Sequence, residues 1–149
     1  VCLEATISDN IYGFNKNVYG IKIDEKKGYE TKFILGLLNS KLLDFYYKKK
    51  FSTKKEDVFP EIQTYLYEQL PIASASKSQQ KEITDIVDEI LRIKRNDCNA
   101  DTTQLEKEID KLVYELYGLT EEEVKVVERC CVNRFLHKIS SFFLLFIKR

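Results

Sequence analysis

The residues best suited to binding chemistry lie in a short basic segment, residues 48–55, with the sequence KKKFSTKK. It holds five lysines in eight positions, with Phe51 among them and Tyr46 and Tyr47 just before. Lysines bind phosphates, and neighbouring aromatic or polar side chains can approach bases or sugars. The cluster is therefore a candidate for contact with a negatively charged partner such as DNA. The alternative is a solvated helix end whose lysines complement the helix dipole.

Other chemistries are poorly represented among the residue types. Four cysteines without CxxC spacing and a single histidine favour neither a zinc site nor a hydrolytic triad, and we expect reduced thiols. The five glycines are scattered, so no phosphate-binding loop is visible. Three acidic residues at alternating positions could in principle bind a cation: Glu106, Glu108 and Asp110. A cation site is not expected there, because alternating positions diverge around a helix. Nothing in the sequence indicates catalysis.

Composition and charge fit one globular domain, with or without an appendage. The chain has 149 residues, 44% apolar and 32% charged, and its 24 basic and 24 acidic side chains cancel. Any affinity for nucleic acid must therefore come from local clustering. The N-terminus has no signal-peptide pattern and the chain contains no methionine, so we interpret it as a fragment of a longer cytoplasmic protein.

The first half of the chain mixes strand and helix patterns. Residues 17–23 alternate β-branched and aromatic residues, which predicts a half-buried strand. Apolar residues then recur every three or four positions, which predicts an amphipathic helix of about five turns over residues 31–50. After a loop at residues 51–60, we expect a short helical turn and then a strand at residues 69–72, where Pro71 would confine it to an edge.

From residue 76 onward the pattern is helical. Two amphipathic helices, residues 79–95 and 104–117, are separated by a short connection, which is typical of an antiparallel hairpin. A shorter helix is expected to about Glu128. The expected helix ends are a capping box at Ser76 and Gln79, a second at Thr103 and Glu106, a C-terminal Gly118 and a cap at Thr120.

These patterns predict an α+β fold, with a mixed strand and helix region followed by an antiparallel helical hairpin. The expected units are residues 1–75, residues 76–128 and an unassigned terminal extension, residues 129–149. The apolar run at residues 142–147 of this extension is far shorter than the roughly 20 residues that span a bilayer, so no membrane partner is expected.

Four segments with ordered spacing carry a family resemblance: ILGLLNSKLLDFYYKKKFS, FPEIQTYLYEQLPI, QQKEITDIVDEIL and ADTTQLEKEIDKLVYELYGLTEEEVKVVE. Over about residues 11–128 the chain resembles the TaqI-like C-terminal specificity region of restriction–modification enzymes. The resemblance implies that residues 1–75 are the distal part of a DNA target recognition domain. It implies that residues 76–128 are a helical spacer that docks against the methyltransferase or nuclease body of the parent protein.

The resemblance also implies a parent that methylates adenine N6 at specific DNA sites, with or without endonuclease activity. Such a parent uses S-adenosylmethionine, and Mg²⁺ if it cleaves. The family's Asn-Pro-Pro-Tyr-type motif and cofactor loops are not found here, because Pro60 and Pro71 are the only prolines. We therefore expect no catalysis and no cofactor in this fragment. The tail after Glu128 and the missing N-terminal strands depart from the family pattern.

Double-stranded DNA is the partner that this interpretation predicts. The expected DNA-binding residues are lysines for phosphates and polar loop residues for bases: Lys48, Lys49, Lys50, Ser52, Thr53, Lys54, Lys55, Asn15 and Asn17. The alternative is a helical protein-interaction or assembly module without direct DNA contact, in which the lysines only solubilise the chain.

Overall fold

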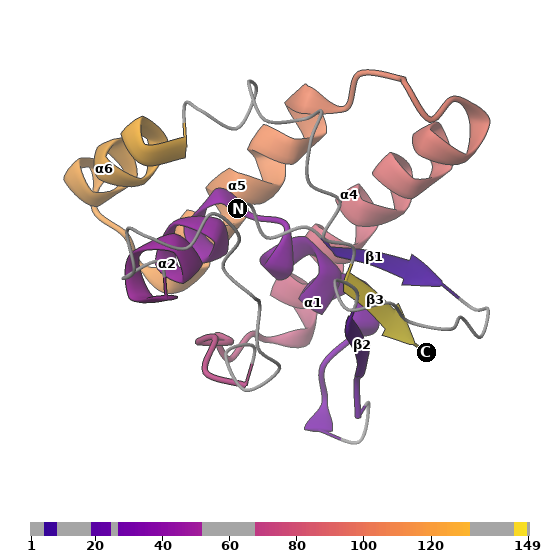
Figure 1. Cartoon of the computed structure of the whole chain (residues 1–149), viewed down its shortest axis with the longest axis horizontal. Helices are drawn as coiled ribbons and strands as arrows, with labels where there is room; N and C mark the ends of the chain where they lie inside the picture. The colour runs from indigo at the N-terminus through magenta and orange to yellow at the C-terminus, as the bar shows by residue number, and fades with distance from the viewer. Residues whose placement is uncertain (1–4, 9–18, 25–26, 52–67, 132–144, 149) are drawn as a thin grey trace.

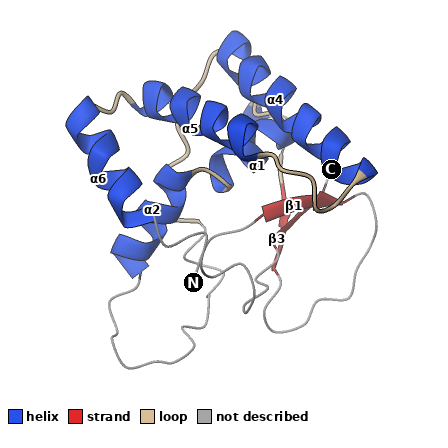
Figure 2. Ribbon diagram, turned by 90° about the horizontal axis from the view of Figure 1, so that it is seen from above, coloured by secondary structure: helices blue, strands red, loops and turns tan. Residues whose placement is uncertain are grey.

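The computed structural model describes residues 5–8, 19–24, 27–51, 68–131 and 145–148. In this part of the chain, five helices form the body of the molecule and three short strands lie beside α1 (Figures 1 and 2). The helices are α1 (Thr31–Leu38), α2 (Lys41–Phe51), α4 (Lys77–Asn96), α5 (Thr103–Tyr117) and α6 (Glu121–Cys131). The strands are β1 (Ala5–Ser8), β2 (Tyr19–Lys22) and β3 (Leu145–Lys148).

The expected α+β class is wrong, because the described residues are organised by helices. Each strand has only four residues, whereas the helices have between 8 and 20. The buried core comes instead from α1, α2, α4 and α5, with Leu70 from the connection between α2 and α4. Strand side chains such as Ile7 and Ile21 pack only at its margin.

The strands pair in the parallel order β1-β3-β2. Leu145 lies opposite Ala5 on one side and opposite Tyr19 on the other, so the C-terminal strand is the central one. The strand expected at residues 17–23 is confirmed over Tyr19–Lys22. The strand at the C-terminus was not expected, since the sequence left residues 129–149 unassigned.

Helix α1 is the centre of the packing. Its buried side chains include Phe33 and Leu37, both fully inaccessible to solvent. Gly36 lets α4 approach closely, because a Cβ atom there would lie 2.6 Å from Cγ2 of Ile83 and 3.2 Å from Cγ2 of Val87. Residues on both sides of the expected boundary at residue 75 thus share one hydrophobic core. The division into separate units stays a prediction.

The long helix expected over residues 31–50 is broken at Asn39 and Ser40. The Asn39 side chain accepts a hydrogen bond from the backbone N–H of Ala5 and donates to the carbonyls of Ala5 and Leu35. The Ser40 hydroxyl donates to the carbonyl of Leu37 over 2.7 Å. Short polar side chains that bond the backbone in this way compete with helical hydrogen bonds, so the chain turns and α2 begins anew.

The expected helix ends are confirmed in three of four cases. Ser76 and Gln79 form the predicted capping box, and Thr120 and Glu123 exchange capping hydrogen bonds at the start of α6. Gly118 ends α5 in the left-handed conformation, with φ of 67°. The box expected at Thr103 is wrong, because Thr103 is already helical and the Thr102 hydroxyl donates to Glu106 instead.

The strand expected at residues 69–72 is also wrong, since this segment is a turn followed by irregular chain. Its backbone groups are bound by a side chain rather than by a strand partner. The Tyr117 hydroxyl donates to the carbonyl of Pro71 over 2.5 Å and accepts from the N–H of Ala73 over 3.2 Å. Leu70 meanwhile is buried in the core.

The close approach at Gly36 generates a stability prediction. Gly36→Ala should lower the free energy of unfolding by about 2 kcal/mol, because overpacking outweighs the better helix propensity of alanine. Chemical denaturation measures this. In the Ile83→Ala background, which removes the nearest atom, the same change should cost less. A Gly36→Ala protein that is more stable than the wild type would contradict the close contact.

Candidate nucleic-acid interface

The basic turn, defined here as Lys48, Lys49 and Lys50, lies in the last turn of α2. Each of its lysines contacts the side chain four positions earlier. The Lys48 ammonium forms an ion pair with Asp44 over 2.7 Å. The Lys49 ammonium lies 5.9 Å from the centre of the Phe45 ring. The Lys50 ammonium donates a hydrogen bond to the Tyr46 hydroxyl over 2.9 Å and lies 5.2 Å from the centre of the Tyr46 ring.

These contacts distinguish the three lysines. Lys48 is bound to a carboxylate that is fully buried, so its charge is largely neutralised within the protein. Lys49 and Lys50 are exposed and meet aromatic rings, which attract the cation without cancelling its charge. The geometry therefore favours Lys49 and Lys50 over Lys48 as groups that can face a phosphate.

The other residues expected to contact DNA lie outside the described part of the chain. These are Asn15, Asn17, Ser52, Thr53, Lys54 and Lys55. In sequence, the last four follow directly on the basic turn. Their roles stay predictions.

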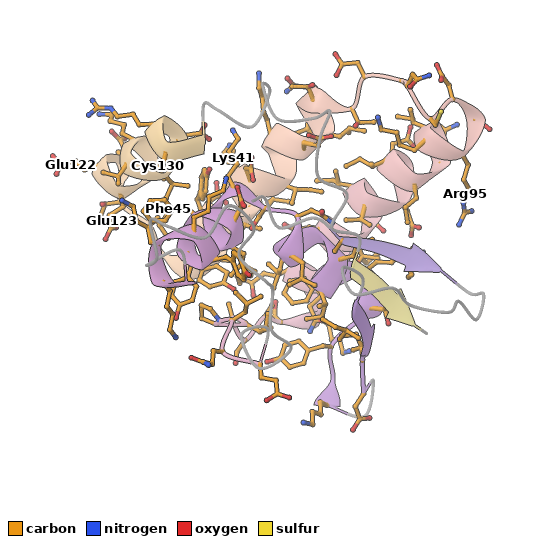
Figure 3. The ribbon with its side chains drawn as sticks, in the orientation of Figure 1. Lys41, Phe45, Arg95, Glu122, Glu123 and Cys130 are labelled. Carbon is orange, nitrogen blue, oxygen red and sulfur yellow. The ribbon has the colours of Figure 1, made fainter. Side chains whose placement is uncertain are left out.

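The opposite end of α2 is bound to two other helices by the Lys41 junction, which consists of Lys41, Asp110, Tyr114 and Glu128. The Lys41 backbone N–H donates to Oδ1 of Asp110 over 2.8 Å, and its ammonium lies 3.4 Å from Oδ2. The same ammonium meets both Glu128 oxygens, at 2.9 and 2.8 Å. The Tyr114 hydroxyl donates to Glu128 Oε1 over 3.0 Å. Figure 3 shows Lys41 at the start of α2 and Phe45 further along it.

The electrostatics of the Lys41 junction favour the charged ammonium. Burial acts to lower the pKa of Lys41, but the hydrogen bond that its ammonium donates to Glu128 and the charges of Asp110 and Glu128 together outweigh this effect, so the pKa is raised. Asp110 is only 4% exposed, whereas the Glu128 side chain is 43% exposed. The Lys41 ammonium thus balances the charge of the buried Asp110 carboxylate, and the junction reaches solvent at Glu128.

The sequence did not identify Asp44 and Asp110 as buried groups. Asp44 is fully buried and Asp110 is nearly so. The spacing of the two aspartates from buried residues gave part of the evidence for their burial. Asp44 lies three residues before the buried Tyr47 and four before Lys48, and Asp110 lies three before the buried Val113. The lysine partner of Asp110 comes from 69 residues away, so no local pattern reveals it.

The described residues show no cluster of three or more side chains suited to a metal ion. Cys98 and Cys130 are free thiols. An open cavity of about 290 Å³ lies between β2, α1 and the segment around Leu70, and apolar side chains such as Ile21 and Ile34 dominate its walls. In the part of the chain that the structure describes, no helix has both the length and the apolar character needed to cross a membrane.

Comparison with known proteins places the basic turn within a recognised family. Residues 2–72 match the model of the TaqI-like C-terminal specificity domain, so the resemblance seen in the sequence is confirmed over this segment. The match includes β1, β2, α1 and α2 and ends before α4. No curated protein and no solved structure matches the chain. The family implies a DNA target-recognition module of a restriction–modification enzyme.

The raised pKa of Lys41 gives a pH prediction. The folded-state pKa exceeds 10.5, so the stabilisation is present below pH 10.5 and is lost as the pH rises through the folded-state value. Lys41→Met should cost about 2 kcal/mol at neutral pH, less than a fully buried pair because Glu128 is partly solvated. Urea unfolding of both proteins across the pH range measures the difference. A difference that vanishes well below pH 10 would contradict the junction.

Proposed function

We propose that this chain, whose residues 2–72 are a TaqI-like specificity domain, recognises the DNA target of a restriction–modification enzyme. It would hold duplex DNA in register for adenine-N6 methylation, cleavage or both by domains outside these 149 residues. The family match is the observation that carries the proposal. An adenine methyltransferase must extrude its target base, so the duplex on either side of that base has to be held in position.

The basic turn supports DNA contact at the end of α2. Lys49 and Lys50 are exposed, and their aromatic partners hold them without neutralising them. We propose that they contact phosphates together with Lys54 and Lys55, which follow four or five residues later in the sequence. Ser52, Thr53, Asn15 and Asn17 are proposed to reach base edges.

The helices after residue 76 are proposed to dock against the catalytic body of the parent protein. The support is structural continuity, because α4 and α5 share their core with α1 and so can transmit the position of the recognition segment rigidly. S-adenosylmethionine, and Mg²⁺ in a cleaving enzyme, would bind to that body. The chain itself is proposed to catalyse neither reaction, since its sequence holds neither the family's adenine-pocket motif nor a cofactor loop.

Salt dependence of binding tests the proposed phosphate contacts. Lys54→Ala with Lys55→Ala in the intact parent should weaken binding to all duplexes alike and flatten the salt slope by about 1.8, roughly 0.9 for each contact. Fluorescence anisotropy over a range of salt concentrations measures the slope. The double substitution is expected to change the free energy of unfolding by less than about 0.5 kcal/mol.

A matched control removes the same charge elsewhere. Lys107 and Lys111 are exposed on α5, and changing both to alanine should leave affinity and slope unchanged. If the α5 variant flattens the slope and the Lys54 and Lys55 variant does not, the DNA path follows the helices instead. If neither variant alters the slope, the lysines only solubilise the chain and an assembly role is favoured.

The absence of catalysis is tested separately. The purified 149-residue chain, incubated with S-adenosylmethionine and duplex DNA, should transfer no methyl groups, and with Mg²⁺ it should leave the duplex intact. Methyl transfer from radiolabelled cofactor and gel analysis of the DNA measure the two reactions. The intact parent serves as the positive control, and activity of the fragment at a comparable rate would overturn the proposal.

A further inference from the structure

The direction of α2 is not inherited from α1. The two helices are separated by Asn39 and Ser40, whose side chains bond the backbone and break the expected continuous helix. The axis of α2, and hence the position of the basic turn at its far end, must therefore be set by contacts that α2 makes itself.

Those contacts are of two kinds, charged hydrogen bonds and apolar packing. Lys41 at its first position is bound to α5 through Asp110 and to α6 through Glu128. Further along, Leu42 and Phe45 pack against the small cluster of Tyr114 and Val127, and α2 and α6 lie side by side (Figure 1). The apolar contacts hold α2 close to its neighbours, but they are not directional. The charged hydrogen bonds of Lys41 are directional.

We propose that Lys41 is a positioning residue, whose junction with Asp110 and Glu128 aims α2 and so places the basic turn against DNA. This inference rests on the proposed function of the basic turn. Helix α2 has 11 residues and is therefore about 16 Å long. A tilt of about 10° at Lys41 would move its far end by about 3 Å, which is the length of a hydrogen bond. Loss of the junction thus removes phosphate contacts that Lys41 itself never makes.

The test compares Lys41→Met with Lys32→Met. Lys32 forms an ion pair with Asp88 that joins α1 to α4, and its side-chain exposure of 22% is close to the 18% of Lys41. Lys32→Met removes one inter-helix ion pair and Lys41→Met removes two, so each variant should lower the melting temperature. Only Lys41→Met acts on α2, so it should weaken duplex binding by the intact parent about tenfold and flatten the salt slope. Lys32→Met should leave binding within about twofold of the wild type, because α2 keeps its direction.

A second measurement follows the direction of α2 without DNA. Spin labels at Lys50→Cys and Arg95→Cys, in a chain with its four native cysteines changed to serine, report the distance from the end of α2 to the end of α4. Figure 3 shows Arg95 on the opposite side of the molecule from α2. Pulsed electron paramagnetic resonance should give a shifted or broadened distance distribution in Lys41→Met and an unchanged distribution in Lys32→Met. Lys41→Arg keeps the charge and should restore the wild-type distance and affinity.

The outcomes separate the two proposals. Unchanged distance and unchanged affinity in Lys41→Met would overturn the positioning role. Equal losses of affinity in Lys41→Met and Lys32→Met would also overturn it, because they would reflect general destabilisation. If the distance shifts in Lys41→Met while changes in the basic turn leave DNA binding intact, α2 is aimed by Lys41 and the proposed DNA contact is wrong.

Discussion

The burial of α1 is the constraint on which the rest of the structure depends. A helix that is buried on most of its surface has no polar face to present to water, so other elements must cover it on several sides. Helix α4 packs against α1 at Gly36, which has no side chain to keep the two helices apart. Helix α5 contributes Ile109 and Val113 to the same core. The short strands cover part of what remains. Helices α4 and α5 are therefore part of the same core as the segment that matches the family.

Periodicity and capping residues allowed much of the helical structure to be predicted. The helices after residue 76 were located well because each is amphipathic and has a strong terminal signal, such as the Ser76 capping box and the left-handed Gly118. The fold class could not be predicted in the same way. Apolar and aromatic residues near the N-terminus suggested a sheet layer, but the observed strands are four residues long and the central one comes from the far end of the chain.

The break at Asn39 shows a second limit of prediction from sequence. Periodicity continues through the break, because apolar residues on both α1 and α2 face the same core. What interrupts the helix is the bonding of the Asn39 amide to Ala5, a residue 34 positions away. The basic turn was found from composition, whereas its division into one neutralised and two exposed lysines depends on the burial of Asp44. The partner of each of these three lysines lies four residues earlier in the sequence. The sequence does not show that the partner of Lys48 is a buried carboxylate, which neutralises the charge of that lysine.

The bond between Tyr117 and the segment around Pro71 has a consequence for where the family ends. The family match stops at Ile72, and the Tyr117 hydroxyl binds the backbone on both sides of that residue. A polypeptide that stopped at Ile72 would lose this support and would also expose the surface of α1 that Ile83, Val87 and Ile109 cover. The family match and the hydrophobic core therefore have different boundaries along the chain. Residues 2–72 placed in another protein would need helices there that cover α1 as α4 and α5 do.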